Sequence, residues 1–259
     1  MIDLHAHLLP GIDDGAPDLA ASVAMARAAV AGGVEAIVAT PHVNLTYGND
    51  PLSFEARVAQ VQAALDRDGV ALRIHTGAEV SHAVLRSLSD EALRACGLGG
   101  GTFVLFEPAL TGPIPFIDRM VDEVQQRGYK VLLAHPERIH AFHRNVELLE
   151  KLVDLGCLTS VTAGSVGGQF GGTVKRFTRE LFARGLVHNL ASDAHDAEHR
   201  SPALRATLDE ALAELPELEA WLDYLTVDVP RAILAGEMPG GEPPVIEPKR
   251  ALFRRLRRR

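Results

Sequence analysis

Short runs of apolar and β-branched residues recur along the chain and alternate with longer segments in which apolar residues repeat every three to four positions. The short runs are typical of buried strands and the longer segments of amphipathic helices. The pattern predicts seven strands, at residues 2–4, 36–40, 72–76, 103–106, 131–134, 158–162 and 187–191. Helical periodicity is clearest in LAASVAMARAAVAGG, FEARVAQVQAALDRDG, FIDRMVDEVQQRG and VKRFTRELFARG, each of which ends at a glycine, a common helix stop.

The regular alternation of strand and helix predicts parallel strands joined by helical crossovers. Seven such units favour a barrel over an open sheet, so the expected fold class is α/β, a TIM-like (β/α)7 barrel. A chain of 259 residues, 47% of them hydrophobic, can bury one large core. We therefore expect a single barrel domain over residues 1–235, with C-terminal helices in 203–235, followed by a Pro/Gly linker and basic tail over 236–259.

Charge is distributed unevenly along the chain. The last eleven residues, KRALFRRLRRR, hold seven of the 26 basic residues and no acid, whereas residues 1–248 hold 19 basic and 34 acidic residues. The net negative charge of residues 1–248 disfavours nucleic acid as a ligand. The tail is interpreted as a solvated segment without a specific role, as a contact for an anionic surface or partner, or as a segment packed on the acidic body.

The sequence also gives expectations for the cellular compartment and for the chemistry of the two cysteines. No signal peptide and no transmembrane segment is evident, so a soluble, cytoplasmic protein is expected. Cys96 and Cys157 are too few for a disulfide framework and too distant for a Cys-x-x-Cys pair, and are expected to be buried thiols. A cysteine phosphatase is excluded, because Thr102 and Ala163 stand where an arginine must follow each cysteine.

Ionisable side chains follow six of the seven predicted strands. In a parallel barrel these positions meet at one face, where active sites form. Strand alternation also points the first two histidines to the same side. One such residue is more often structural, but the whole set indicates a multinuclear metal site, since buried imidazoles and carboxylates are costly unless paired or metal-bound. The predicted ligands are His5, His7, Asp14, His42, Glu79, Glu107, His135, Asp193 and His195.

The order HAH, Asp14, TPH, GAE, Glu107, AHPER and SDAH resembles the polymerase and histidinol phosphatase (PHP) superfamily. The stretches IDLHAHLLPGIDDGA, AHPER, VTAGSV and DVPRAIL are similar, more specifically, to the bacterial metal-dependent protein-tyrosine phosphatases of capsule and exopolysaccharide biosynthesis. The resemblance covers residues 1–235. It implies a distorted (β/α)7 barrel that binds three divalent ions, with manganese favoured over iron or zinc.

The resemblance also implies roles for individual residues. One metal would be held by His5, His7, Glu79 and Asp193, a second by Glu79, Glu107 and His135, and a third by Asp14, His42 and His195. Asp13 competes with Asp14 for its place. Arg138 and Arg200 match positions that bind phosphate, the alternative being that they pair with surface acids.

Clustered divalent ions would supply a metal-bound hydroxide for attack on a phosphomonoester. The resemblance implies a phosphotyrosine substrate, such as the C-terminal tail of a membrane tyrosine kinase that controls polysaccharide export. The glycine-rich stretch TAGSVGGQFGGT is expected to be a mobile rim over the site or merely a flexible loop. The alternatives are a small-metabolite phosphatase of the histidinol phosphate type, a nuclease, or a metal-stabilised binding protein without activity. The oligomeric state is left open.

Overall fold

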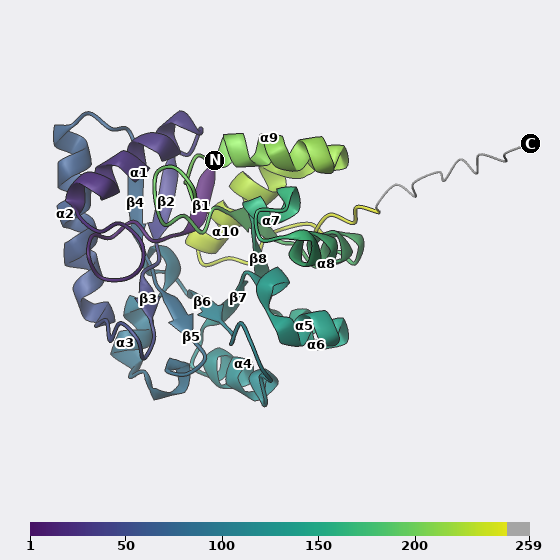
Figure 1. The fold of residues 1–259 in the computed structure, drawn as a ribbon. Helices are drawn as coiled ribbons and strands as arrows, with labels where there is room; N and C mark the ends of the chain where they lie inside the picture. Colours follow the sequence, from purple (N-terminus) through teal and green to yellow (C-terminus); the bar gives the residue numbers. More distant parts are fainter. Residues whose placement is uncertain (248–259) are drawn as a thin grey trace, which may run out of the picture.

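The strands lie at the centre of the molecule and the helices lie around them (Figure 1). The structure, a computed structural model, describes residues 1–247. One parallel sheet has the order β1 (Ile2–Ala6), β2 (Ala36–Ala39), β4 (Arg73–Thr76). The other, also parallel, has the order β3 (His42–Val43), β5 (Glu79–Ser81), β6 (Phe103–Glu107), β7 (Lys130–Ala134), β8 (Leu158–Thr162), β9 (Asn189–Ala191).

Each of the seven predicted strands overlaps a strand of the structure, but β3 and β5 were not predicted. Both are short. β3 follows β2 after an interruption of the strand at Pro41, and β5 follows β4 after an interruption at Gly77. Proline cannot donate to a strand ladder. At Gly77 a Cβ atom would lie 2.6 Å from Cγ1 of Val38, so the chain there passes too close to β2 for a side chain. These two breaks divide the strands between two sheets.

The predicted TIM-like barrel is therefore confirmed only as a mixed α/β fold with parallel sheets, since the described strands form no single closed sheet. Two contacts nevertheless join β1 to the segment after β9. Ala6 forms a parallel bridge with Ala194. In addition, Oδ1 of the buried Asp3 accepts hydrogen bonds from the backbone N–H groups of His5 (3.2 Å) and Ser192 (3.0 Å).

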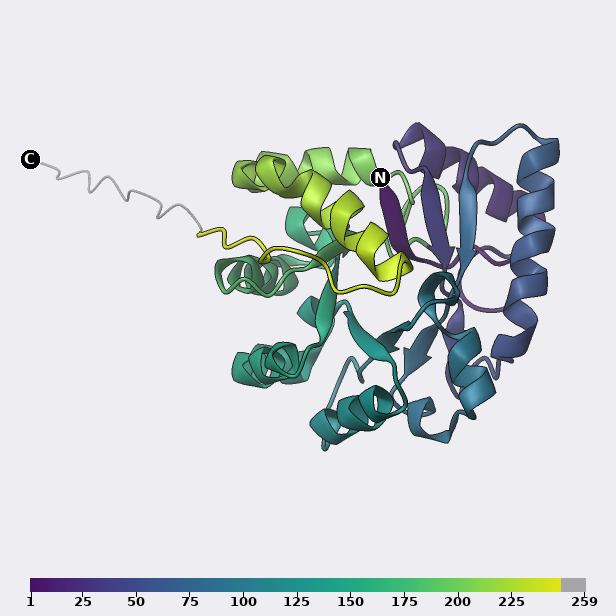
Figure 2. The ribbon, with the colours of Figure 1, turned by 180° about the vertical axis from the view of Figure 1, so that it is seen from behind.

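The helices cover the outer faces of the strands, as the front and back views together show (Figures 1 and 2). The longer helices are α1 (Leu19–Ala31), α2 (Phe54–Arg67), α4 (Ile117–Gln126), α6 (Val146–Asp154), α8 (Gly172–Ala183) and α9 (Leu204–Glu214). The shorter ones are α3 (Asp90–Ala95), α5 (His140–Arg144), α7 (Ala163–Gly167) and α10 (Val229–Leu234). The glycine-rich stretch expected to form a rim is mostly helical, because α7 and α8 leave only residues 168–171 between them.

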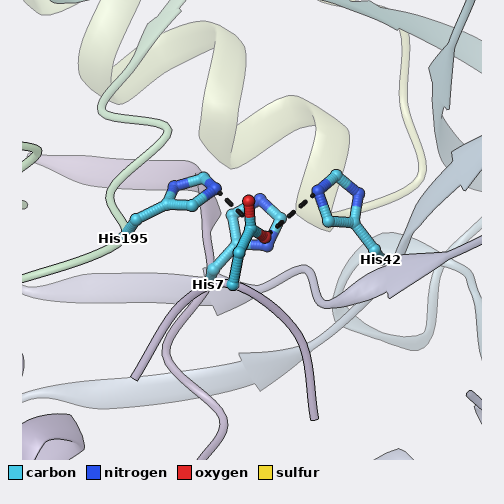
Figure 3. Close-up of side chains that lie close together, drawn as sticks. His7, His42 and His195 are labelled. Atoms are coloured by element: carbon cyan, nitrogen blue, oxygen red, sulfur yellow. Dashed lines mark ion pairs between the residues drawn. The ribbon is translucent and has the colours of Figure 1, made fainter. Parts of the chain in front are cut away.

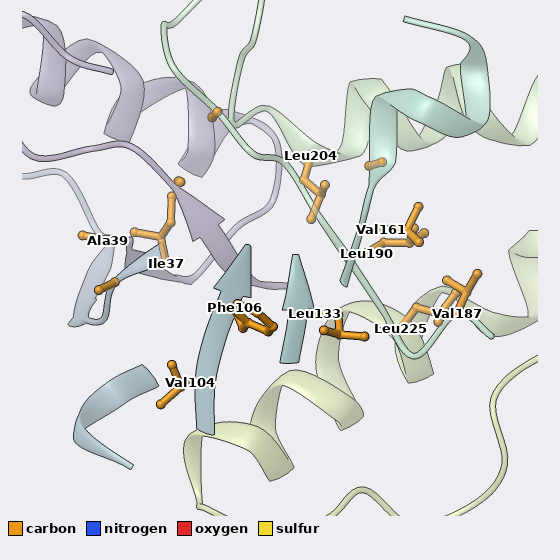
Figure 4. Packing of buried hydrophobic residues seen from close by; sticks show 14 of the residues in the cluster. Ile37, Ala39, Val104, Phe106, Leu133, Val161, Val187, Leu190, Leu204 and Leu225 are labelled. Atoms are coloured by element: carbon orange, nitrogen blue, oxygen red, sulfur yellow. The ribbon is translucent and has the colours of Figure 1, made fainter. Parts of the chain in front are cut away.

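Both faces of the strands are buried, as is usual for parallel sheets. One large cluster fills the space under the helices and includes Val104, Phe106 and Leu133 (Figure 4). The alternate residues Phe103 and Leu105 of β6 belong to a second, smaller cluster that also contains residues of α10. The strands are thus held between two hydrophobic layers. This packing also fixes the positions of the strand ends.

The chain ends and the cysteines bear on three further expectations. Ile246 is buried and its N–H donates to the carbonyl of Phe182, so part of the predicted linker packs on the domain. The expected basic tail, residues 249–259, lies outside the described residues. Cys96 and Cys157 are buried free thiols, as predicted, and burial raises the pKa of each to about 12. Within residues 1–247 no helix has the length and hydropathy needed to cross a membrane.

His188 provides a pH-dependent contribution to stability. Burial lowers its pKa from 6.5 to about 4, and its Nδ1 accepts a hydrogen bond from the N–H of Thr159. Between pH 6.5 and 4 the unfolded chain binds a proton that the folded chain does not, so stability falls as the pH falls through this window. We expect urea unfolding at pH 7 and pH 4 to differ by about 3 kcal/mol more in the parent protein than in His188→Asn. Equal pH dependence in the two proteins would contradict this assignment.

Candidate metal centre

The nine predicted ligands all lie at or just beyond the C-terminal ends of strands. His5 and Glu107 belong to β1 and β6. His42 and Glu79 lie just beyond the C-terminal ends of β2 and β4, where β3 and β5 begin. The others follow β1, β7 and β9. Parallel strands bring these positions to one face, as the sequence predicted.

Three groups of these side chains could each hold a cation. Within a group the ligand atoms lie within 4.8 Å of one another, and the groups are His7, Asp14, His42, His195; His5, His7, Asp193; and His42, Glu79, Glu107. Figure 3 shows the first group, with dashed lines for the ion pairs of His42 and His195. Their Nε2 atoms lie 3.4 and 3.5 Å from Oδ1 of Asp14. His135 lies just outside the third group, with its Nε2 atom 2.9 Å from Glu79 and 3.6 Å from Glu107.

The structure separates the roles of Asp13 and Asp14. The side chain of Asp13 is fully buried, and its Oδ2 lies 2.9 Å from Nδ1 of His7 and accepts the N–H of His42 at 3.1 Å. Asp14 instead points its carboxylate toward the histidines of the first group and is 49% exposed. The turn depends on Gly15, where a Cβ atom would lie 2.1 Å from the carbonyl oxygen of His7. Asp14 therefore lies among the candidate ligands, and Asp13 orients His7.

Hydrogen bonds at Nδ1 direct two imidazoles into the centre. Asp13 binds Nδ1 of His7, and Nδ1 of His195 lies 3.0 Å from the carbonyl oxygen of Asp193. In both residues the remaining nitrogen, Nε2, faces the other candidate ligands. Such partners fix the tautomer and ring orientation of metal-binding histidines.

Glu79 is the most connected residue of the centre. Its buried carboxylate lies 3.4 Å from both His5 and His7, 3.0 Å from His42 and 2.9 Å from His135. Burial opposes its ionisation, but the charge of His5 and a hydrogen bond from His135 hold the pKa of Glu79 well below its usual range. A carboxylate that contacts members of all three groups is suited to bridge metal ions.

Two candidate ligands occupy backbone conformations that are rare for residues other than glycine. His135 has φ 31° and Asp193 has φ 51°, and Phe116 is the third such residue of the described chain. Strained conformations of this kind are found at functional sites, where the surrounding structure holds them. Here they turn both side chains from the strand ends into the centre.

Arg138 and Arg200 converge on a single carboxylate oxygen. Nη1 of Arg138 donates a hydrogen bond to Oδ2 of Asp193 at 2.7 Å. Nη2 of Arg200 forms an ion pair with the same oxygen at 2.7 Å and donates a hydrogen bond to the backbone carbonyl of Asp193 at 3.0 Å. The ring of Phe170 lies 4.6 and 5.9 Å from the Cζ atoms of Arg138 and Arg200. Although burial opposes ionisation of Asp193, the charges of His5, His135 and Arg200 lower its pKa to about 2. Both arginines thus adjoin the centre through Asp193 instead of pairing with surface acids.

The donor set fits divalent cations. Nδ1 of His42 lies 3.0 Å from Oε2 of Glu79, yet neither buried atom makes a hydrogen bond, nor does Nδ1 of His135. The hydrogen bond with Asp13 and the charge of Glu79 overcome burial and raise the pKa of His7 to about 10. Nitrogen and oxygen donors without sulfur suit Mn²⁺, Fe²⁺ or Zn²⁺.

Sequence reasoning missed two aromatic residues of this region. Phe170 covers the arginine pair, and Tyr47 is stacked on His42 with the ring centroids 5.7 Å apart. Tyr47 lies in the loop after β3, a position of the kind that identified the ligands, whereas Phe170 lies in the short loop between α7 and α8. Phe170 belongs to the glycine-rich stretch that was expected to form a rim or a flexible loop, but neither aromatic ring was itself predicted to contact the site, because neither is a typical metal ligand.

Comparison with known proteins gives consistent results. The family model described as capsular polysaccharide synthesis, CpsB/CapC, matches residues 1–234. The chain is 33% identical to tyrosine-protein phosphatase YwqE of Bacillus subtilis, with 98% of this chain and 99% of YwqE aligned. It is 26% identical to tyrosine-protein phosphatase CpsB of Streptococcus pneumoniae, with 92% of this chain and all of CpsB aligned.

A solved structure supports the same relationship. It comes from work on YwqE of Bacillus subtilis and CpsB of Streptococcus pneumoniae, which are described as metal-dependent tyrosine phosphatases. It superposes on the present structure with a TM-score of 0.83 at 33% identity and covers 96% of this chain and 100% of its own. The α/β fold and its parallel sheets are therefore those of the solved relative.

Proposed function

Because this chain belongs to the CpsB/CapC family of capsular polysaccharide synthesis, we propose that it is a metal-dependent protein-tyrosine phosphatase. The observation that carries the proposal is the convergence of nine nitrogen and oxygen donors on one face, beside two arginines that share Asp193. The relatives named above are tyrosine phosphatases, and a centre of this composition suits hydrolysis of a phosphomonoester.

Three divalent ions would be held by the nine predicted ligands. Glu79 contacts histidines of every group and would be shared between ions. When bound, such ions lower the pKa of water to about 7 and neutralise charge on phosphoryl oxygens. Manganese is the proposed native metal, with iron or zinc as the alternatives that the donor set also suits.

The residues of the chain itself would orient the phosphate. Arg138 and Arg200 present guanidinium groups at the edge of the centre, and both are only partly buried, at 19% and 27% exposure. Guanidinium groups bind phosphoryl oxygens through paired hydrogen bonds. Two such groups would hold the phosphate in one orientation, which favours in-line attack on phosphorus. Asp193 holds the two arginines together, so the phosphate site would lie next to the metal ligands.

A tyrosyl phosphate suits this arrangement. Phenolate is a good leaving group, since the pKa of tyrosine is about 10, and its departure needs little help from an acid. Asp14 is half exposed, so the centre is accessible from solvent on that side. The proposed substrate is the phosphotyrosine tail of a membrane kinase that controls capsule or exopolysaccharide export, and the proposed location is the cytoplasm, where such a tail would be accessible.

The barrel domain over residues 1–235 also remains a proposal. It is supported by the short gaps between β2 and β3 and between β4 and β5, and by the bridge between Ala6 and Ala194. Together these features would continue the strands around a ring.

One comparison of substrates tests the proposed function. The protein loaded with Mn²⁺ is expected to hydrolyse a phosphotyrosine peptide with a higher kcat/KM than histidinol phosphate, and to leave single-stranded DNA intact. Preference for histidinol phosphate would identify a small-metabolite phosphatase, and cleavage of DNA a nuclease. Binding of the phosphopeptide without turnover under every metal would indicate a binding protein.

A further inference from the structure

Tyr47 places an aromatic ring at the solvent-facing edge of the candidate metal centre. Its ring is nearly parallel to that of His42, with an interplanar angle of 5° and centroids 5.7 Å apart, the geometry of an offset stack. The residue is still 38% exposed. One part of the ring therefore contacts a candidate ligand, and another part is free to contact a molecule that enters from solvent.

The loop that carries Tyr47 is fixed by hydrogen bonds. Oδ1 of Asn44 accepts the N–H groups of Thr46 and Tyr47 at 2.9 and 3.0 Å, which forms a tight turn. Nδ2 of Asn49 donates to the carbonyl groups of Ile12 and His42 at 3.0 and 2.9 Å. These bonds attach the loop to the segment that contains Asp14 and to His42 itself, so the position of the ring is preorganised.

The neighbours of Tyr47 show what the ring could bind. It lies beside two of the three most exposed candidate ligands. The side chains of Asp14, Glu107 and His42 are 49%, 16% and 14% exposed, and those of the other candidate ligands are at most 9% exposed. A phosphate bound at the buried donors would extend its organic group outward past this edge. A flat leaving group could then lie against the tyrosine ring, whereas a flexible alkyl group would gain less from it.

We propose that Tyr47 is a specificity-determining residue that contacts the phenyl ring of an aryl phosphate substrate. The inference rests on the proposed phosphatase function and adds a reason, within this chain, for preference of aryl over alkyl phosphates. Aromatic pairs contribute beyond the area that they bury, by an amount that corresponds to a roughly two- to tenfold change in affinity.

Small esters test the role of Tyr47 without contributions from a peptide. We expect Tyr47→Leu to raise the KM for phenyl phosphate by about three- to tenfold and to leave the KM for butyl phosphate within about twofold. Tyr47→Phe keeps the ring and should keep the selectivity of the parent protein. Leu45→Ala is the matched control, because Leu45 is 78% exposed in the same loop and should affect neither ester.

A binding measurement provides a second readout. Calorimetric titration of the Mn²⁺-loaded protein with phenylphosphonate should show weaker binding to Tyr47→Leu by the same factor, and butylphosphonate should bind both proteins alike. If Tyr47→Leu raised the KM values for phenyl and butyl phosphate equally, or lost bound metal, Tyr47 would only position His42 and the inference would be overturned. No change in either ester would overturn it as well. A parent protein that binds phosphonates but hydrolyses neither ester would contradict the phosphatase function and leave the contact testable by binding.

Discussion

Treatment with EDTA is expected to abolish phosphotyrosine hydrolysis, by at least about 10³-fold, because divalent ions held by the nine candidate ligands would lower the pKa of water from 15.7 to about 7. Without cations neither cysteine can serve as the nucleophile instead. Both cysteines are buried, with pKa values raised to about 12. Addition of Mn²⁺ to the dialysed protein should restore the activity, measured alongside the metal content by elemental analysis.

The same treatment should reduce thermal stability. Cations that bind only the folded protein stabilise it by mass action, and here they would also neutralise the buried carboxylates of Glu79 and Asp193. We therefore expect a lower Tm in EDTA and its recovery with Mn²⁺, while circular dichroism confirms that the metal-free protein is folded. Full activity in a preparation with less than about one metal ion per ten chains would contradict the proposed mechanism.

The positions of the candidate ligands could be predicted because they depend on a simple rule. Parallel strands bring their C-terminal ends together, so the order of strands and ionisable residues is sufficient to predict that His5, Glu107 and His135 meet. The structure brings these residues together with the other six. The seven strands were equally predictable, since their apolar runs are bounded by helical periodicity.

Other features depend on close contacts that the pattern does not encode. Asp13 and Asp14 could not be distinguished by sequence. The structure places the carboxylate of Asp13 against Nδ1 of His7 and that of Asp14 beside His42, in a turn where Gly15 approaches His7 closely. The breaks near Pro41 and Gly77 divide strands that were expected to be continuous in a barrel. The orientation of the two aspartates and the interruption of the strands both depend on tertiary packing, which local propensity does not determine.

The two arginines illustrate the same limit. Their positions just after candidate ligands predicted a place near the phosphate, but not the shared contact with Asp193 or the covering ring of Phe170. That contact joins η4 (Pro136–Arg138), the segment after β9 and the loop between α7 and α8. Three segments so distant in sequence meet only when the sheet is assembled.

Substitution of Glu79 by glutamine is expected to lower kcat/KM by roughly 10²–10³-fold, as loss of a major charge-stabilising group does at other active sites. The amide keeps the shape of the side chain but removes a negative charge that lies within 3.4 Å of four histidines. It also offers one acceptor oxygen where a bridging ligand needs two. Elemental analysis should therefore find fewer bound metal ions in Glu79→Gln than in the parent protein.

Glu137→Gln is the matched control for this substitution, because Glu137 is equally buried and lies two residues after His135 but belongs to none of the three groups. Burial raises the pKa of Glu137, and its Oε1 accepts hydrogen bonds from the N–H of Thr162 (3.0 Å) and Oγ of Ser165 (2.7 Å). A glutamine oxygen can accept both bonds, so we expect the full complement of metal and a change in kcat/KM of less than about tenfold. If the two variants lost activity equally while both retained all their metal, Glu79 would not be a ligand. Its contacts with the histidines would then serve to stabilise the fold.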